Sequence, residues 1–106
     1  MNARIDRILG ELRRGLQGLY GQRLVRVVLF GSQARGDADA ASDIDVAVLL
    51  RGRVAPGKEI ARTGRLAAEI SLAHDVVISC VFVAARRWAT EQSPLLMNAR
   101  QEGITL

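Results

Sequence analysis

The sequence predicts a small mixed α/β fold, in which a short β-sheet is covered by amphipathic helices. In the first part of the chain and in its middle, apolar residues recur three and four positions apart, which is the spacing of one helix face. Three short apolar runs stand between and after these stretches and are typical of buried strands. The predicted order is therefore helix, strand, strand, helix, strand, helix.

The first helix is predicted for residues 4–19. Its apolar positions lie on one side: Ile5, Ile8, Leu9, Leu12, Leu16 and Leu19. Gly21 is suited to end this helix, because glycine adopts a left-handed backbone at little cost. Residues 24–30 form a short apolar run rich in β-branched side chains. This run predicts a buried strand.

A turn and a second strand follow. Residues 31–36 contain two glycines and a serine and predict a turn into a brief helix. Residues 37–42 are small and polar and predict a loop. Residues 43–50 predict a second strand, which is apolar after the carboxylates Asp43 and Asp45. Because side chains alternate along a strand, these two carboxylates point to the same face.

The second half of the chain supplies the remaining strand. Residues 51–57 hold two glycines and a proline and predict a connector. Residues 59–72 carry apolar positions on one side and predict a helix. Residues 75–83 are almost wholly apolar and predict the third strand. The sheet is thus expected to have three main strands.

The C-terminal part is predicted to be helical. Residues 84–91 favour one helix, and a final helix starts at Ser93, a good N-cap that is followed by a proline. This last helix is expected to end near Gly103, and Ile104 and Leu106 are expected to fold back onto the body of the protein.

Length and composition indicate the number of domains and argue against a secreted, a membrane-spanning or a disulfide-linked protein. A chain of 106 residues, 49% of them apolar, is expected to be one domain over residues 1–106 with a modest core. No signal peptide and no membrane span are expected, because charges interrupt the early residues and no apolar run is long enough. A single cysteine, Cys80, cannot form an internal disulfide, and a reducing cytoplasm is the simplest location.

The chain is basic, with a formal net charge of +4, and Lys58 is its only lysine. A basic surface can meet nucleic acid, nucleotide phosphates or an acidic protein. The arginines are scattered and not interleaved with aromatic residues, so a solvated surface is favoured and nucleic acid is not expected as a direct ligand.

Asp43 and Asp45 are the first candidates for chemistry. Two carboxylates on one face repel each other and are costly to desolvate unless a cation lies between them. Hard oxygen ligands of this kind suit Mg²⁺. The alternative is a polar start to a strand, with Asp43 and Ser42 serving only the turn.

Gly31 and Ser32 are the second candidates. A glycine lets the backbone approach a ligand closely, and a serine at the start of a helix offers an N–H and a hydroxyl to a phosphate. The alternative is an ordinary turn in which Ser32 is an N-cap without a ligand. Phosphate and metal together indicate phosphoryl or nucleotidyl transfer.

These residues resemble a known signature. Gly31-Ser32, ten intervening residues and Asp43-Ile44-Asp45 resemble the motif of the DNA polymerase beta-like nucleotidyltransferase superfamily. Ala34-Arg35-Gly36 and the serine before Asp43 add to the resemblance, which covers roughly residues 24–106. The short length is similar to that of minimal nucleotidyltransferases that act as antitoxins and are often paired with a small helical HEPN protein.

The resemblance implies a fold and a metal site. It implies a short mixed sheet with helices packed on one face, and two Mg²⁺ ions held by Asp43, Asp45 and a third acid. Asp75 is the only acid on the third predicted strand and is the candidate for that ligand, although it stands at the very beginning of the strand. If the family position falls in mid-strand, Ser79 or Cys80 occupies it and the third acid is missing. Asp75 would then only cap the preceding helix.

Arg35 has two interpretations. It is a candidate nucleotide-binding residue together with Gly31 and Ser32, because it follows them on the same turn. Alternatively, it pairs with the loop acids Asp37 and Asp39 and has a mainly structural role.

The resemblance also implies a reaction and a partner. It implies transfer of AMP, from ATP or another nucleoside triphosphate, to a hydroxyl of a HEPN toxin that is thereby neutralised. One alternative is a binding module that neutralises its partner by contact alone, and another, suggested by charge only, is a nucleic-acid-binding protein. The many Leu and Ala residues of the helices favour a homo- or hetero-oligomer, and the identity of the nucleotide and its acceptor stays open.

Overall fold

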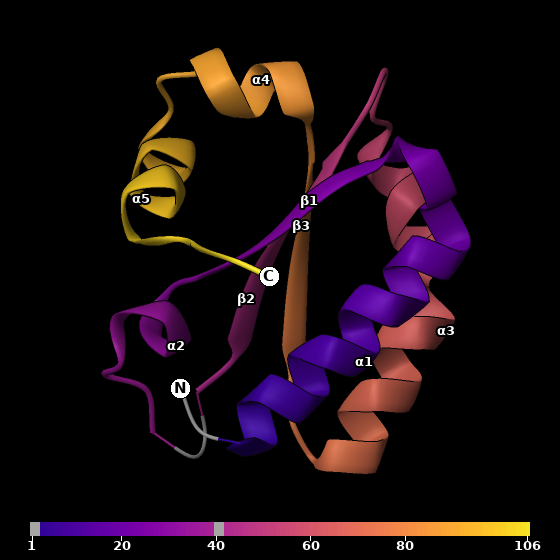
Figure 1. The fold of residues 1–106 in the computed structure, drawn as a ribbon, viewed down its shortest axis with the longest axis vertical. Coiled ribbons are helices and arrows are strands. Elements are labelled where there is room, and N and C mark those ends of the chain that lie inside the picture. The colour runs from indigo at the N-terminus through magenta and orange to yellow at the C-terminus, as the bar shows by residue number, and fades with distance from the viewer. Residues whose placement is uncertain (1–2, 40–41) are drawn as a thin grey trace.

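The computed structural model describes residues 3–39 and 42–106. Figure 1 shows helices around a twisted sheet. The elements, in chain order, are α1 (Ala3–Tyr20), the 3₁₀ turn η1 (Gly21–Arg23), β1 (Leu24–Phe30), α2 (Ser32–Arg35), β2 (Ile44–Leu50), α3 (Pro56–His74), β3 (Ile78–Ala84), α4 (Ala85–Thr90), α5 (Pro94–Glu102) and β4 (Ile104–Thr105).

The four strands lie in the order β3-β2-β1-β4. β1 is antiparallel to both β2 and β4, whereas β2 and β3 are parallel. Phe30 at the end of β1 pairs with Asp45 near the start of β2, and Asp45 in turn lies opposite Ser79 on β3. This register brings the end of β1 and the beginnings of β2 and β3 to one edge of the sheet.

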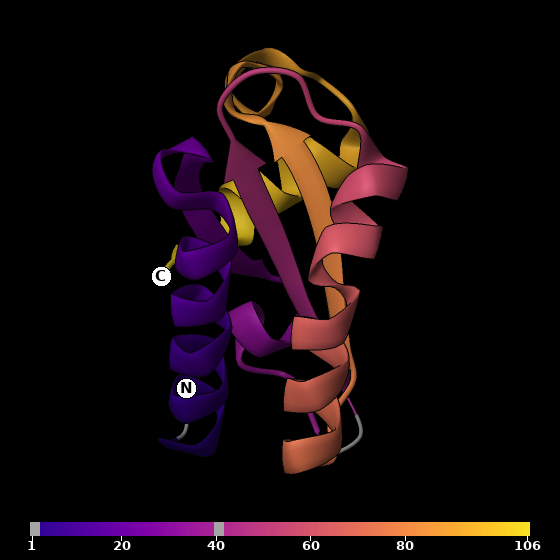
Figure 2. The ribbon, with the colours of Figure 1, turned by 90° about the vertical axis from the view of Figure 1, so that its right-hand side faces the viewer.

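The long helices α1 and α3 cover one face of the sheet (Figure 2). The apolar stripe of α1 is buried against the strands as predicted, with one change: Leu19 is exposed and Tyr20 is buried in its place. A Cβ built on Gly15 would overlap with Leu66 of α3, so a glycine at this position lets the two helices approach closely.

The other face is covered by α4 and α5. A second apolar cluster lies there: Val28, Phe30, Ala47, Leu49, Val83, Trp88, Leu96 and Ala99. Alternate β2 residues contribute to each cluster, as the two-residue period of a strand requires. The expectation of helices on one face therefore holds for α1 and α3 and has to be corrected for α4 and α5.

Two boundaries differ from the sequence prediction. The helix predicted over residues 59–72 is longer and includes Pro56 at its first position, which proline tolerates because the first N–H of a helix has no partner within it. β3 begins at Ile78, so Asp75 precedes the strand and forms the C-cap of α3. The predicted return of the C-terminus is confirmed, since Ile104 and Thr105 pair with β1 as a short fourth strand.

The predicted start of the last helix is confirmed. Ser93 is its N-cap and accepts a hydrogen bond from the backbone N–H of Leu96 at 3.4 Å. Within the part of the chain that the structure describes, no helix is both long enough and apolar enough to cross a membrane.

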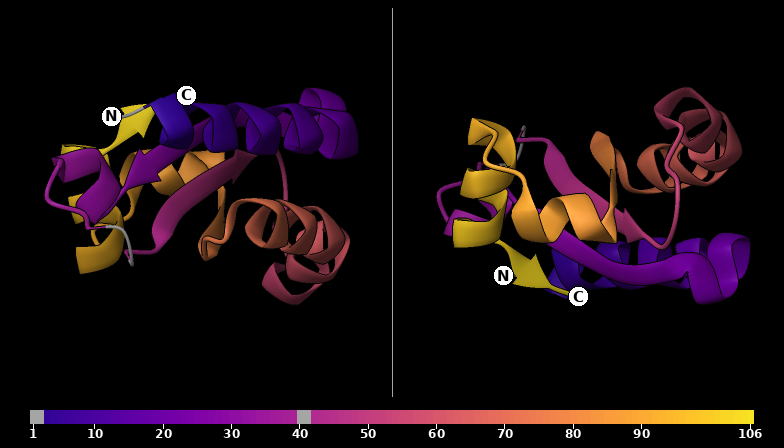
Figure 3. Two further views of the ribbon diagram at one scale, coloured as in Figure 1. Left: turned by 90° about the horizontal axis from the view of Figure 1, so that it is seen from below. Right: turned by 90° about the horizontal axis from the view of Figure 1, so that it is seen from above.

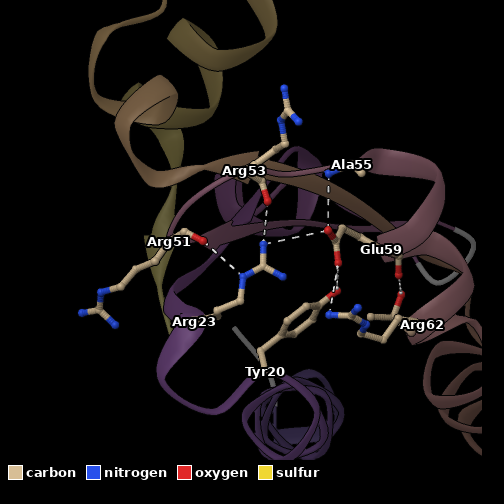
Figure 4. A network of polar contacts seen from close by, with 8 residues as sticks. Tyr20, Arg23, Arg51, Arg53, Ala55, Glu59 and Arg62 are labelled. Atoms are coloured by element: carbon tan, nitrogen blue, oxygen red, sulfur yellow. Dashed lines mark hydrogen bonds and ion pairs between the residues drawn. The ribbon is translucent and has the colours of Figure 1, made fainter.

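A buried polar network ties the end of α1 to the start of α3 (Figure 4). The carboxylate of Glu59, only 3% exposed, accepts hydrogen bonds from the Tyr20 hydroxyl at 2.9 Å and from the Ala55 N–H at 3.4 Å. Arg23 and Arg62 lie 4.0 and 3.8 Å from its oxygens, and both guanidinium groups stand over the Tyr20 ring. The buried charge of Glu59 is therefore neutralised within the chain itself.

Candidate active site

The candidate site lies where β1 ends and β2 begins. Gly31 leaves β1 with a φ of 73°, a left-handed conformation that glycine adopts without strain. A Cβ built at this position would also overlap with the Asp45 carboxylate. Glycine is needed here for both reasons, and its absent side chain lets the turn lie directly against Asp45.

Ser32 opens the short helix α2. Gly31 occupies the N-cap position, and its carbonyl accepts the N–H groups of Ala34 and Arg35, each at 3.1 Å. The interpretation of Ser32 as the N-cap is therefore wrong, because Ser32 is the first helical residue. The backbone N–H groups of Ser32 and Gln33 precede the first bond within the helix and point out of it, as the first N–H groups of a helix do. Together with the Ser32 hydroxyl they form a donor set suited to a phosphate oxygen.

Asp43 and Asp45 stand beside this turn. Asp43 is exposed and comes directly before β2, whereas Asp45 is half-buried on the strand. Within the described residues, neither carboxylate has an ion pair or a hydrogen bond. Burial raises the pKa of Asp45, the negative charge of Asp43 raises it further, and the charge of Arg35 offsets only part of this rise. The pair has the electrostatics of a site suited to bind a cation.

Asp75 is not brought to this pair. It is exposed at the C-cap of α3, in a left-handed conformation with φ 54°, and its N–H donates to the Ser71 carbonyl. The β3 residue opposite Asp45 is Ser79. Over residues 3–39 and 42–106, no group of three or more His, Cys, Asp or Glu side chains is arranged to hold a metal ion. The position of Asp75 thus agrees with the capping role and not with a third metal ligand.

Arg35 is engaged by two carboxylates. Its guanidinium donates from Nε to Asp37 at 3.2 Å and from Nη1 to Glu102 at 3.1 Å. These two hydrogen bonds, first that with Glu102, raise the pKa of Arg35. The geometry favours the structural pairing of Arg35 over a direct contact with nucleotide.

Glu102 is the site residue that sequence reasoning missed. It lies at the end of α5, and its Oε1 accepts the Gly31 N–H at 2.9 Å while its Oε2 accepts Arg35. Figure 3 shows α2 beside α5 when the molecule is seen from below. The bonds from Gly31 and Arg35 hold the pKa of Glu102 below its ordinary value. An acid 71 positions further along the chain carries no local signal of this contact, which arises only because β4 folds back beside β1.

Comparison with known proteins decides the family. Residues 8–83 match the sequence profile described as "Nucleotidyltransferase domain". The chain belongs to this family. A nucleotidyltransferase domain acts on a nucleoside triphosphate with a divalent metal, so the chain is a nucleotidyltransferase enzyme by family.

Two named relatives come from Methanocaldococcus jannaschii, and both are named as candidate protein adenylyltransferases. MJ0141 is 37% identical over 75 residues, which are 71% of this chain and 75% of that protein. MJ1305 is 29% identical over 96 residues, which are 91% of this chain and 56% of that protein.

Solved structures share the fold. A toxin–antitoxin with AMP-PNP superimposes with a TM-score of 0.67 at 22% identity, over 91% of this chain and 69% of that one. A mutant of the toxin–antitoxin MntA-HpeT gives a TM-score of 0.61 at 20% identity, over 94% of this chain and 69% of that one. The similarity at this identity establishes a common fold.

The residues present fit a divalent metal. Mg²⁺ in phosphate-transferring sites is held by one or two carboxylates together with substrate phosphates and water. Asp43 and Asp45 supply two carboxylates, neither of which has an ion pair or a hydrogen bond within the described residues. A complete cage of protein ligands is not required for such a site.

Proposed function

We propose that this chain is a magnesium-dependent nucleotidyltransferase that moves AMP from ATP to a hydroxyl group of a partner protein. The observation that carries the proposal is the Asp43–Asp45 pair, which has no ion pair within the described residues and whose Asp45 lies against the glycine-serine turn at Gly31. The names of both relatives support protein adenylylation as the activity.

Each residue has a role in this proposal. Asp43 and Asp45 hold Mg²⁺, two ions in the full arrangement, and the metal supplies neutralisation of the triphosphate charge. Ser32 and Gln33 donate their backbone N–H groups, and Ser32 its hydroxyl, to the phosphate oxygens. Gly31 keeps the backbone close to Asp45, so that phosphate donors and carboxylates lie side by side.

The proposed step is a direct transfer. The hydroxyl oxygen of the acceptor forms a bond to the α-phosphorus of ATP, and the bond from that phosphorus to the bridging oxygen breaks. Pyrophosphate leaves with the electron pair, and the hydroxyl proton passes to solvent. Because Ser79 stands opposite Asp45, β3 offers no carboxylate as a base there. The chain therefore accelerates the reaction through positioning and charge neutralisation.

The partner in this proposal is a toxin. The fold neighbours are toxin–antitoxin proteins, one of them with a nucleotide analogue, which supports a toxin as the acceptor and a nucleotide as the donor. In this proposal, following what the family resemblance implies, the toxin is a small helical protein of the HEPN type and this chain is its antitoxin in the cytoplasm.

The test is transfer of label. Purified protein is mixed with α-³²P-ATP and Mg²⁺, with and without the product of the neighbouring gene. We expect label on the partner with the wild type, none with Asp43→Ala or Asp45→Ala, and full labelling with Glu69→Gln. Glu69 is a suitable control because it is an exposed acid on α3 that pairs only with Arg65 in the described structure.

The second candidate function is a binding module that neutralises its partner by contact. The specific observation in its favour is Ser79 in the place opposite Asp45, with Asp75 turned to a capping role. A stable complex with the partner but no label, under conditions where the wild type is folded, would replace the enzyme by this module.

A further inference from the structure

We infer that Glu102 is a positioning residue of the proposed nucleotide site: its carboxylate fixes the Gly31 turn and holds Arg35 away from the metal-binding carboxylates. This inference rests on the proposed function. Glu102 lies beyond residues 8–83, to which the family match extends.

The first part of the inference is the bond to the turn. Gly31 adopts φ 73° and ψ −158°, a conformation that is accessible essentially only to glycine. Because glycine has no side chain, contacts of its own side chain cannot stabilise this conformation. Glu102 accepts the Gly31 N–H at 2.9 Å, with its side chain only 21% exposed. A hydrogen bond to a charged acceptor is stronger than one between neutral groups, so it helps to fix the direction in which the following N–H groups point.

The second part is the charge of Arg35. An arginine near two carboxylates that bind metal would compete with the metal for them. The Gly31 turn lies directly against Asp45, and the Glu102 carboxylate that accepts the Gly31 N–H also accepts Arg35, so the guanidinium is held close to the site. It donates to Glu102 and to Asp37. Glu102 thereby helps to leave Asp45 without a partner within the described chain.

The C-terminal segment positions the Glu102 carboxylate beside the Gly31 turn. A Cβ on Gly103 would overlap with the Ala99 carbonyl and with Val28 of β1, so the chain passes β1 closely where only glycine fits. Directly after it, Ile104 pairs with Leu29, and the Leu106 N–H donates to the Val27 carbonyl at 2.9 Å. The backbone that carries Glu102 is therefore fixed beside β1 by the close packing at Gly103 and by the pairing of β4.

Electrostatics and positioning predict opposite signs for removal of Glu102. A carboxylate near a triphosphate repels it, so loss of the charge alone tightens nucleotide binding. Loss of the two contacts of Glu102 frees the Gly31 turn and lets Arg35 move toward Asp45, so it weakens nucleotide binding. The sign of the change in affinity separates the two roles.

The experiment is calorimetric titration of MgATP into wild type, Glu102→Ala, Glu102→Gln and Glu91→Gln. We expect Glu102→Ala to bind about tenfold more weakly, because a charged hydrogen bond is lost. Glu102→Gln keeps an oxygen acceptor for the Gly31 N–H but loses the ion pair with Arg35. Its affinity for MgATP is therefore expected to lie between that of the wild type and that of Glu102→Ala. Glu91 lies between α4 and α5 and pairs with Arg87. Glu91→Gln removes this carboxylate and is expected to bind MgATP like the wild type.

The Gly31 amide gives a second readout that needs no nucleotide. The chemical shift of its amide proton and its protection from hydrogen exchange are expected to fall in Glu102→Ala and to be largely kept in Glu102→Gln. The same spectra show whether each variant is folded. Unchanged or tighter MgATP binding by a folded Glu102→Ala would overturn the inference while leaving the proposed function in place. No MgATP binding by the wild type would overturn the proposed function, and the inference with it.

Discussion

Two acidic residues at opposite ends of the sheet, Glu59 and Asp45, show how one chain treats a carboxylate in two ways. Burial alone would raise the pKa of Glu59, but Tyr20, the Ala55 N–H and two arginines offset this, so its pKa lies below the ordinary value. Burial likewise raises the pKa of Asp45, and there the nearby Asp43 adds to the rise. Over residues 3–39 and 42–106, the carboxylate of Glu59 has hydrogen-bond donors and ion-pair partners, and that of Asp45 has neither.

The difference separates a structural acid from a functional one. The chain has 15 basic residues against 11 acidic ones, so a shortage of basic side chains does not explain why Asp45 has no ion pair in the part of the chain that the structure describes. Arg35 is near enough to serve but is engaged by Glu102 and Asp37. A half-buried acid without an ion pair, next to a second acid and a phosphate-binding turn, therefore indicates a site for an external cation.

The largest expected effect is at Asp45. Asp45→Asn is expected to lower the transfer of label to the partner at least about a hundredfold, because a metal ligand is lost. Its melting temperature in metal-free buffer is expected to equal or exceed that of the wild type, since the change removes a repulsive charge beside Asp43. Retained transfer, or a large fall in melting temperature, would show that Asp45 is a structural acid like Glu59.

The next effect is at Glu59, and it falls on stability. Glu59→Ala leaves the buried Tyr20 hydroxyl and the Ala55 N–H without their acceptor, so the free energy of unfolding is expected to fall by roughly 1–3 kcal/mol. Urea unfolding measures it, with Glu69→Ala as the exposed control, for which a change within about 0.5 kcal/mol is expected. The folded fraction of Glu59→Ala should still transfer nucleotide, and selective loss of transfer would place Glu59 in the site.

The pH dependence of stability tests the same comparison. A lowered pKa in the folded state means that ionised Glu59 stabilises the fold at any pH above its ordinary value of 4.5. This stabilisation is lost as the pH falls through the folded pKa. The difference in unfolding free energy between wild type and Glu59→Gln is therefore expected to be constant from pH 7 to about 5 and to shrink in more acidic solution. A difference that grows on acidification would contradict the assignment.

The smallest effect is at Tyr20. Tyr20→Phe removes one hydrogen bond to Glu59 and keeps the ring on which the guanidinium groups of Arg23 and Arg62 lie at 5.7 and 5.6 Å. The cost in unfolding free energy is expected to be about 1 kcal/mol. Together with Glu59→Ala it forms a double-mutant cycle, and additive effects would mean that the two residues do not act as one network.

Much of the fold could be predicted from hydrophobic pattern. The stripe of α1, the apolar runs of β1 and β2, and Ser93 as an N-cap all follow from local sequence. The start of β3 could not be placed, because Val76 and Val77 continue the apolar run in the sequence, whereas the strand itself begins only at Ile78, after the left-handed backbone of Asp75 has ended α3. β4 could not be predicted as a strand, because its two residues form a strand only through their pairing with β1.

The candidate site was predictable in part. Spacing places Asp43 and Asp45 near Gly31 because an antiparallel pair joined by a short loop brings its ends together. The partner of Arg35 could not be foreseen beyond the nearby Asp37, since Glu102 arrives from the far end of the chain. The capping position of Asp75 depends on where the helix stops, which residue types alone do not fix.

The most direct test is the binding of Mn²⁺, a spectroscopic substitute for Mg²⁺, followed by electron paramagnetic resonance in the presence of ATP. The account predicts that the wild type and Glu59→Gln bind Mn²⁺ with ATP, whereas Asp43→Asn and Asp45→Asn lose this binding although they are folded. Equal Mn²⁺ binding by the wild type and the two aspartate variants would contradict the account, because the acids of this site would then have no part in holding the metal.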